Sequence, residues 1–159
     1  HLHGHSYVAF FTARVKPALA TQLFRDLSQS VDPQSAFLDE IGRVVDFSVL
    51  KEQVGGWIES KWDHGFILSK DDNASHRVIE LAARSLPNGQ KLHIMPYNPT
   101  AENMTRYLLQ EVGPKVLAGT PSVELCHVRI WETENCYADA SLADHELVAI
   151  SSDSVLTGD

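Results

Sequence analysis

The stretch that most constrains this chain is residues 1–15, where closely spaced histidines run directly into a strand pattern. His3, Gly4 and His5 precede the strand-forming residues 7–15. In extended backbone, residues two apart point to the same face, so His3 and His5 would present imidazoles about 7 Å apart. Neutral imidazoles suit Zn²⁺, which needs three protein ligands and one open position for catalysis. Histidines at a chain start are also typical of tag remnants, but a tag would not continue without a break into a strand.

Length, charge and cysteine content exclude several classes of protein. At 159 residues and 43% hydrophobic composition, we expect one globular domain over residues 1–150. A net charge of −8 argues against a general nucleic-acid-binding protein, because phosphate contacts need clustered Lys and Arg. No apolar run approaches the roughly 18 residues of a membrane span, and no signal-peptide pattern is visible at the start. Cys126 and Cys136 are too few for a disulfide framework, which favours a reducing compartment such as the cytoplasm.

Hydrophobic spacing and turn residues predict helices that separate short strands. Asp46 is in an N-cap position, and Gly55 and Gly56 in the following helix predict close packing or a kink there. Gly113 and Pro114 predict the end of a later helix. This order of elements indicates an α+β sandwich with an antiparallel sheet, followed by a flexible tail over residues 151–159. The expected elements are a strand over 7–15, a helix over 18–28, a strand over 42–45, a helix over 47–58 with Phe47, Leu50, Val54, Trp57 and Ile58 on its apolar face, an apolar stretch at 66–68, a helix over 73–86, a strand over 91–95, a helix over 100–112, and a hairpin of 122–130 and 136–138.

Five short motifs then follow one another along the chain. They are His3-Gly4-His5, the stretch from Gly42 to Asp46 and on to Lys51, Asp63-His64, the run from Asn98 through Thr100 and Glu102 to Asn103, and Ile130-Trp131-Glu132-Thr133. Together they resemble the family of 6-pyruvoyltetrahydropterin synthase and 6-carboxytetrahydropterin synthase, and the resemblance covers residues 1–137. It implies the tunnelling fold, in which antiparallel sheets with helices on one face join into a barrel when the subunits assemble.

The pair Asp63-His64 offers a base that titrates near neutral pH beside a carboxylate that can orient it and stabilise its cation. An Asp-His step is common and is usually structural when it occurs alone. In the enzymes that this chain resembles, the pair belongs to a proton relay with a cysteine. The resemblance therefore assigns a catalytic role to Asp63 and His64.

Glu132 follows a predicted strand, where a lone glutamate is most often a solvated surface residue. A pterin, however, presents a 2-amino group and an N3–H side by side, and one carboxylate can accept both hydrogen bonds. The family uses the glutamate of its Glu-Thr motif in this way, and Glu132-Thr133 matches that motif. Thr100 and Glu102 are interpreted mainly as a helix start, with a possible supporting role beside the pterin.

Two features of the family are absent from the sequence. The third zinc histidine of the resembling enzymes lies on an earlier strand, and their catalytic cysteine lies four residues before the position of His3. We therefore expect that the sequence lacks its natural start, with both residues upstream of residue 1. His1 is an alternative third ligand, although three alternate strand positions span too far for one tetrahedral ion. The other histidines are interpreted as surface or strand residues, and the length of the segment over 17–41 has no assigned purpose.

The resemblance implies a zinc-dependent lyase that converts 7,8-dihydroneopterin triphosphate to 6-carboxy-5,6,7,8-tetrahydropterin, a step of queuosine synthesis. One alternative is a 6-pyruvoyltetrahydropterin synthase that releases triphosphate, and another is a catalytically silent relative that binds a pterin or a metal. The implied site consists of His3 and His5 on zinc, Asp63 and His64 in catalysis, and Glu132, Thr100 and Glu102 around the substrate. The implied assembly is a homohexamer, a dimer of trimers, without a nucleic-acid or membrane partner.

Overall fold

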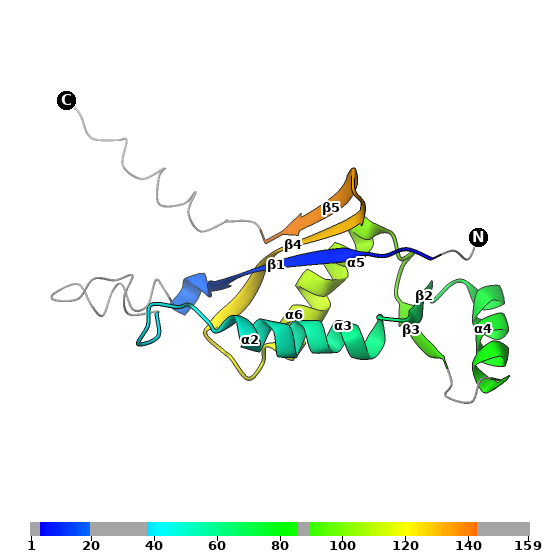
Figure 1. The fold of residues 1–159 in the computed structure, drawn as a ribbon, viewed down its shortest axis with the longest axis horizontal. Coiled ribbons are helices and arrows are strands. Elements are labelled where there is room, and N and C mark those ends of the chain that lie inside the picture. Colours follow the sequence, from blue (N-terminus) through cyan, green and yellow to red (C-terminus); the bar gives the residue numbers. More distant parts are fainter. Residues whose placement is uncertain (1–3, 20–37, 86–89, 143–159) are drawn as a thin grey trace, which may run out of the picture.

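The computed structural model describes residues 4–19, 38–85 and 90–142. Its centre is a three-stranded antiparallel sheet in the order β1-β4-β5, made of β1 (Val8–Val15), β4 (Val123–Thr133) and β5 (Cys136–Ser141). The strand predicted over 7–15 and the predicted hairpin are confirmed, and the two hairpin strands continue further than predicted, to Thr133 and to Ser141. The longest strand therefore lies in the middle and pairs with the strand that follows the histidine motif (Figure 1).

Alternation along the strands decides which face of the sheet is covered. On β1, Phe10 is 56% exposed, whereas Phe11 on the opposite face packs against the core. On β4, the buried positions are spaced by two residues except between Leu125 and Val128. The register of β1 against β4 shifts at that point, as a β-bulge requires. The bulge keeps the apolar residues of β4 on one face of the sheet.

Helices cover that face, as predicted. The segment formed by α5 (Ala101–Tyr107), the π-helical turn η3 (Leu108–Val112) and α6 (Gly113–Val116) packs across the sheet (Figure 1). A second segment, made of α2 (Phe47–Leu50), the π-helical turn η2 (Lys51–Gly55) and α3 (Gly56–Lys61), runs alongside β1 in the same view. The core joins both segments to the sheet through Val54, Met104, Leu108, Leu109, Val112, Leu125, Val128 and Ile130.

A smaller parallel sheet lies at one end of the molecule (Figure 1). It pairs β2 (Gly65–Ser69) with β3 (Lys91–Met95), and α4 (Asn73–Ser85) connects the two strands. The strand predicted over 91–95 is confirmed, but it does not join the antiparallel sheet. A helical connection of this kind brings its two strands side by side in the same direction, which explains the parallel pairing.

The strand predicted over 42–45 is wrong. These residues form bends and turns, and Gly42 has a φ of 85°, in the left-handed region that favours glycine. The carboxylate of Asp39 accepts hydrogen bonds from the backbone N–H groups of Ile41 and Arg43, so a local turn satisfies groups that a strand would have paired. The N-cap prediction is confirmed, because Oδ1 of Asp46 accepts a hydrogen bond from the backbone N–H of Ser48.

The helix end predicted at Gly113 and Pro114 is also wrong, because helix continues to Val116. The π-helical turn η3 allows this: the Gly113 N–H bonds to the Leu108 carbonyl, and the wider turn accommodates a proline that has no N–H. Gly113 serves packing instead, since a Cβ on it would lie 3.0 Å from Cδ1 of Leu125.

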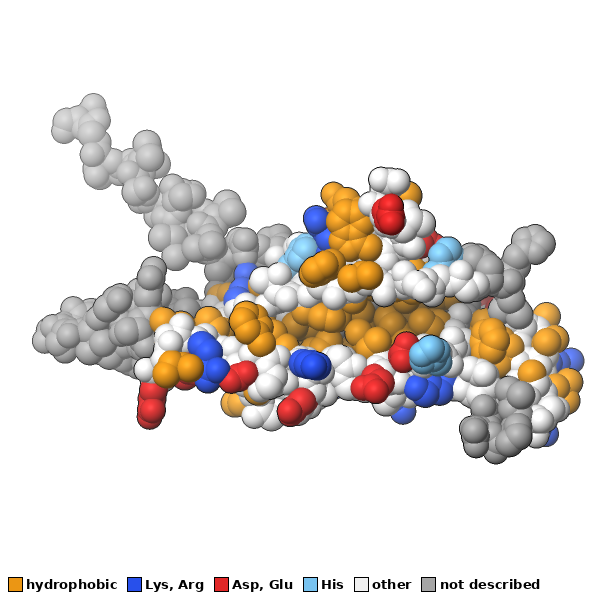
Figure 2. Space-filling view, in the orientation of Figure 1, with side chains coloured by type: hydrophobic (Ala, Val, Ile, Leu, Met, Phe, Trp, Pro, Cys, Tyr) orange, Lys and Arg blue, Asp and Glu red, His pale blue; other side chains and the backbone are white. Residues whose placement is uncertain are grey.

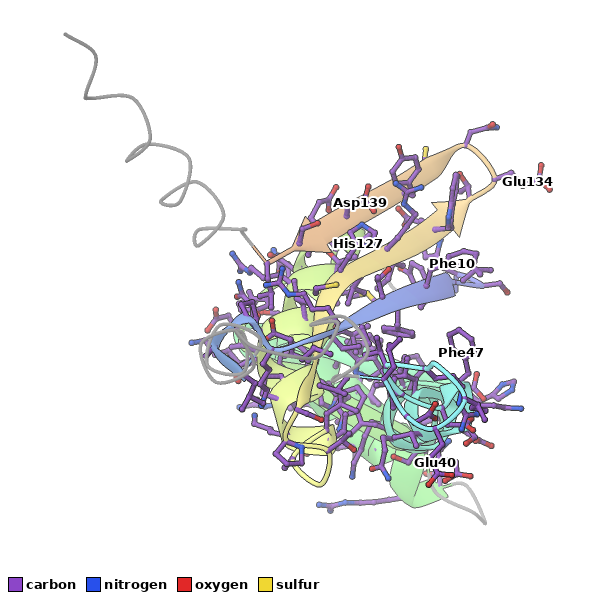
Figure 3. All side chains as sticks on the ribbon, turned by 90° about the vertical axis from the view of Figure 1, so that its left-hand side faces the viewer. Phe10, Glu40, Phe47, His127, Glu134 and Asp139 are labelled. Atoms are coloured by element: carbon purple, nitrogen blue, oxygen red, sulfur yellow. The ribbon has the colours of Figure 1, made fainter. Side chains whose placement is uncertain are left out.

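Close packing at Gly55 and Gly56 is not found, since Cβ atoms added there would meet nothing nearer than 4.0 Å. The helix is nevertheless irregular at this point, because the π-helical turn η2 ends at Gly55. Phe47 does not belong to the buried face: as the first residue of its helix it is 83% exposed. Figure 3 shows Phe47 and Phe10 on the same side of the molecule. Most of the helix expected over 18–28, and the tail expected over 151–159, lie outside the described residues.

Candidate active site

Two of the predicted site residues meet at the start of β1. Nε2 of His5 lies 3.3 Å from Oε1 of Glu132, and the two side chains are about a quarter and a third exposed, 25% and 36%. Glu132 reaches this point because Val8 pairs with Trp131, which brings the residues before β1 beside the end of β4. Glu132 itself lies at a register shift of β4 against β5, between Trp131 and Thr133, and has no paired residue on β5. The predicted zinc ligand and the predicted pterin-binding carboxylate are therefore neighbours.

Tyr7 completes this group. The rings of His5 and Tyr7 are 5.4 Å apart, and Tyr7 packs against the hydrophobic core. Burial raises the pKa of the Tyr7 hydroxyl above its ordinary value, and the nearby charge of Glu132 raises it further. The hydroxyl therefore stays protonated at neutral pH and can donate a hydrogen bond beside the carboxylate.

The zinc prediction rests on His3 and His5, and His3 lies outside the described residues. Over the described ranges, no three His, Cys, Asp or Glu side chains are close enough to bind one metal ion. His5 itself fits the role of a zinc ligand, because it is an imidazole beside a carboxylate that can orient a metal-bound ring. It would be one of the three protein ligands that a catalytic zinc needs.

Asp63 and His64 lie in the turn between α3 and β2. The backbone N–H groups of Trp62 and Asp63 both bond to the Ile58 carbonyl, which ends the helix. His64 then adopts a φ of 53°, and Gly65 begins β2. Nε2 of His64 lies 3.6 Å from Oδ2 of Asp63, a distance for an ion pair but too long for a hydrogen bond. Both side chains are open to solvent, with the imidazole 92% exposed.

Thr100 and Glu102 form the helix start that the sequence predicts. Thr100 is the N-cap of α5, and its Oγ1 accepts a 3.3 Å hydrogen bond from the Asn103 backbone N–H. Hydrogen bonds from the Glu102 backbone and from the Thr100 hydroxyl lower the pKa of the Glu102 carboxyl. Asn103 also donates from Nδ2 to the Asn98 carbonyl at 2.9 Å, which fixes the loop before the helix. These contacts account for the motif structurally, and its role beside a substrate stays a prediction.

An aromatic cluster, which the sequence analysis missed, lies beside the Asp63 turn. It contains Trp57, Trp62, His93 and Tyr107, whose ring centroids are 5.3 to 6.2 Å apart. Nε1 of Trp62 and Nε2 of His93 are buried without a hydrogen-bond partner in the described part of the chain. Burial, and to a smaller extent the charge of Lys61, lowers the pKa of His93, so this imidazole is neutral. The sequence offered two signals for this cluster: His93 at a predicted strand position, and two tryptophans, Trp57 in a predicted helix and Trp62 shortly after it.

A third histidine-carboxylate pair lies on the uncovered face of the sheet. Nε2 of His127 lies 3.1 Å from Oδ1 of Asp139, and Arg129 donates to both oxygens of Asp139 at 2.7 Å. The guanidinium of Arg129 also stacks 4.0 Å from the ring centroid of Tyr137. Figure 3 shows His127 and Asp139 together on neighbouring strands. Because Arg129 already neutralises Asp139, this pair is best explained as a cross-strand ion pair.

The two halves of the predicted site come to the same end of the fold. The start of β1 and the end of α3 both face the end that carries β2, β3 and α4 (Figure 1). Between the antiparallel sheet and the α2–α3 segment, Figure 2 shows a hollow with an apolar floor and with charged and histidine side chains along its rim. The arrangement combines an apolar recess with acidic and basic groups, as small-molecule sites commonly do.

The described residues include no helix that is both long and apolar enough to span a membrane. Cys126 and Cys136 do not form a disulfide, and Sγ of Cys126 lies 3.5 Å from the Thr12 carbonyl oxygen.

Known proteins match most of this chain. The family model described as 6-pyruvoyl tetrahydropterin synthase matches residues 1–142. A protein of Rickettsia felis named 6-carboxy-5,6,7,8-tetrahydropterin synthase is 35% identical over 138 residues, which cover 87% of this chain and 81% of that protein. A Rickettsia bellii protein of the same name is 30% identical over 139 residues, with 87% and 82% covered.

A structural comparison agrees on the fold. A crystal structure of an uncharacterised protein from Wolinella succinogenes superposes with a TM-score of 0.52 at 16% identity, covering 89% of this chain and 100% of that chain. At this identity the likeness concerns the fold alone, whereas the family match extends over both halves of the candidate site. The chain therefore belongs to the 6-pyruvoyl tetrahydropterin synthase family of lyase-type enzymes, which share the tunnelling fold.

Proposed function

We propose that this chain converts 7,8-dihydroneopterin triphosphate to 6-carboxy-5,6,7,8-tetrahydropterin, which would give it a place in queuosine synthesis. The name shared by the Rickettsia relatives supports this product. The observation that carries the proposal is the carboxylate of Glu132 at the start of β1, beside His5 and Tyr7. The description of the matching family model favours the 6-pyruvoyl product, which is the second candidate.

In this proposal Glu132 binds the pterin. Its carboxylate accepts hydrogen bonds from the 2-amino group and the N3–H, two donors on one edge of the ring. The Tyr7 hydroxyl is protonated and can donate to an acceptor on the same ring. Thr100 and Glu102 are assigned a supporting role, through the loop that their capping contacts fix before α5.

Asp63 and His64 move protons in this proposal. The exposed imidazole of His64 is free to approach a substrate, and the Asp63 carboxylate lies close enough to stabilise its cation. His3 and His5 are assigned to Zn²⁺, in keeping with a family of generally metal-dependent enzymes. When bound, the zinc would act as a Lewis acid on the side-chain oxygens of the substrate.

Product analysis tests the function. The three-carbon side chain of the substrate must lose a two-carbon fragment, besides triphosphate, to leave a single carboxylate carbon. The pyruvoyl product keeps all three carbons. Mass spectrometry of the pterin after incubation with 7,8-dihydroneopterin triphosphate therefore separates the two reactions. A chain that binds a pterin and releases no triphosphate would instead be the silent relative.

We further propose a homohexamer that works in the cytoplasm without nucleic-acid or membrane partners. In the described part of the chain, β1 and β5 each pair on one side only, which leaves two sheet edges for other subunits. That Cys126 and Cys136 do not form a disulfide is in keeping with a reducing compartment. Sedimentation at micromolar concentration tests the assembly, and a stable monomer would contradict it.

A further inference from the structure

The turn that carries Asp63 and His64 has an unusual backbone. His64 is the one non-glycine residue of the described ranges with a positive φ, at 53°. This left-handed conformation is strained for a residue with a Cβ, so it persists only where the surrounding structure imposes it. The side chains of the pair cannot impose it, because their 3.6 Å contact is no hydrogen bond and the imidazole is almost fully exposed.

Two side chains from the start of β3 hold the backbone of this turn. Nζ of Lys91 donates to the Glu59 carbonyl at 2.6 Å and to the Asp63 carbonyl at 3.0 Å. Nε2 of Gln90 donates to the His64 carbonyl at 2.8 Å. Lys91 thus satisfies carbonyls that the end of α3 leaves without a partner, and a cation is favoured at that end of a helix. Lys91, the first residue of β3, and Gln90, directly before it, therefore hold the carbonyls of Asp63 and His64.

Gly65 allows this approach. It pairs with Lys91 in the parallel sheet, and a Cβ on Gly65 would lie 3.0 Å from Cβ of Lys91 and 3.1 Å from the Trp62 carbonyl oxygen. A side chain at this position would push β3 away from the turn. The bare backbone of Gly65 lets the stem of Lys91 pass beside the turn and reach both carbonyls.

We propose that Gln90 and Lys91 are positioning residues for the reaction. They do not touch the substrate in our assignment but set the direction in which the Asp63 and His64 side chains leave the backbone. The inference rests on the proposed function, because the position of this turn affects turnover only if His64 transfers a proton. A displacement of about 1 Å at a catalytic group can lower the rate about 100-fold, so a backbone clamp of this kind would be visible in turnover.

The experiment compares Lys91→Met and Gln90→Met, which keep chain length and remove the donors, with Lys91→Arg, which keeps a cationic donor. Lys115→Met is the matched control, since Lys115 pairs with Glu111 on an exposed helix face. Each methionine variant at the turn should lower kcat by about 10- to 100-fold with little change in KM. Lys91→Arg should recover much of the loss, and Lys115→Met should behave as the wild type.

A second measurement needs no activity. With ¹³C-labelled histidine, the ring signal of His64, identified by its loss in His64→Ala, should shift or broaden in the two turn variants and not in Lys115→Met. If the wild-type chain does not turn over, the proposed function fails and this signal still tests the clamp. An unchanged His64 signal in both turn variants would overturn the inference, as would a double variant with the wild-type kcat. Circular dichroism confirms that each variant is folded, and Gln90→Met alone suffices if Lys91→Met does not fold.

Discussion

Nε2 of His5 faces Oε1 of Glu132 across 3.3 Å, so the residue assigned to zinc and the residue assigned to the pterin contact each other. This contact couples the two roles. A metal-bound imidazole is normally oriented by an acceptor at its other nitrogen, and Glu132 can be that acceptor only while its carboxylate is not fully engaged by the pterin. The effects of changing the two residues can nevertheless be separated, because only His5 is a proposed metal ligand.

The first prediction concerns metal content. The intact protein should hold about one zinc per chain, and the double change His3→Ala and His5→Ala should release it, because a catalytic zinc needs three ligands. The fold should survive, since the core is built from other residues. His127→Ala is the matched control, as it removes a histidine that also faces a carboxylate. Elemental analysis that finds equal zinc in the wild type and the double variant would refute the assignment.

The second prediction separates Glu132 from Asp63. Glu132→Gln keeps the size but replaces one acceptor oxygen with a donor that faces the donors of the pterin, so binding should weaken by about 1.5–3 kcal/mol or more. Asp63→Asn should leave pterin affinity nearly unchanged and lower turnover, because it disturbs only the His64 imidazole and its cation. Calorimetry with a non-reactive pterin measures both variants. Abolished binding in Asp63→Asn together with normal binding in Glu132→Gln would show that the two roles are assigned the wrong way round.

The third prediction is a pH dependence of stability that arises from His93. Its pKa is lowered in the folded state, so below the ordinary value of about 6.5 the unfolded chain binds more protons than the folded one. The contribution of the neutral His93 imidazole to the free energy of unfolding is therefore fully present above about pH 6.5. It decreases as the pH falls towards the lowered pKa. His93→Phe keeps a ring in the aromatic cluster and removes the titrating group.

Urea unfolding at about pH 7.5 and about pH 5.5 measures this effect at fixed protein concentration. The wild type should lose more stability between the two values than His93→Phe does. The variant also removes the partnerless Nε2, so it should lose little stability at the higher pH. Equal losses in the two proteins would contradict the assignment of the pH dependence to His93.

The sequence predicted the elements whose hydrophobic pattern is regular, namely the strand after the histidines and the hairpin. It also predicted the helix cap at Asp46, because aspartate is a common N-cap residue. It failed where one residue has two possible uses. Glycine followed by proline is a common helix stop, yet Gly113 instead provides room for the Leu125 side chain. Leu125 belongs to β4, which comes later in the chain, so the local sequence could not show this contact. The residues over 42–45 have strand propensity, but the Asp39 carboxylate binds the backbone N–H groups of Ile41 and Arg43, which favours a turn over a strand.

The site could be predicted only as far as its motifs reach. The motifs identified His5 and Glu132 but gave no sign that their side chains touch. The contacts of Gln90 and Lys91 were invisible because they run from side chain to backbone between residues 26 to 32 positions apart. Nothing in the spacing of such residues distinguishes them from a solvated polar pair at a strand start. Only the pairing of β2 with β3 brings them to the turn that carries Asp63 and His64.

The last prediction contrasts two helical glycines. Gly113→Ala places a Cβ 3.0 Å from Cδ1 of Leu125 and 3.3 Å from the Leu108 carbonyl oxygen, so either the Leu125 side chain or α6 must shift by a few tenths of an ångström. Overpacking of this kind costs about 1–3 kcal/mol. Gly56→Ala is the matched control, because its Cβ would meet nothing within 4 Å and alanine favours the helix by about 0.5–1 kcal/mol. Urea unfolding at fixed protein concentration should therefore move the two midpoints in opposite directions. A Gly113→Ala midpoint equal to or above that of the wild type would show that the contact between α6 and β4 yields easily. A lower midpoint for Gly56→Ala would instead indicate that the open side of α3 is covered in the assembled protein.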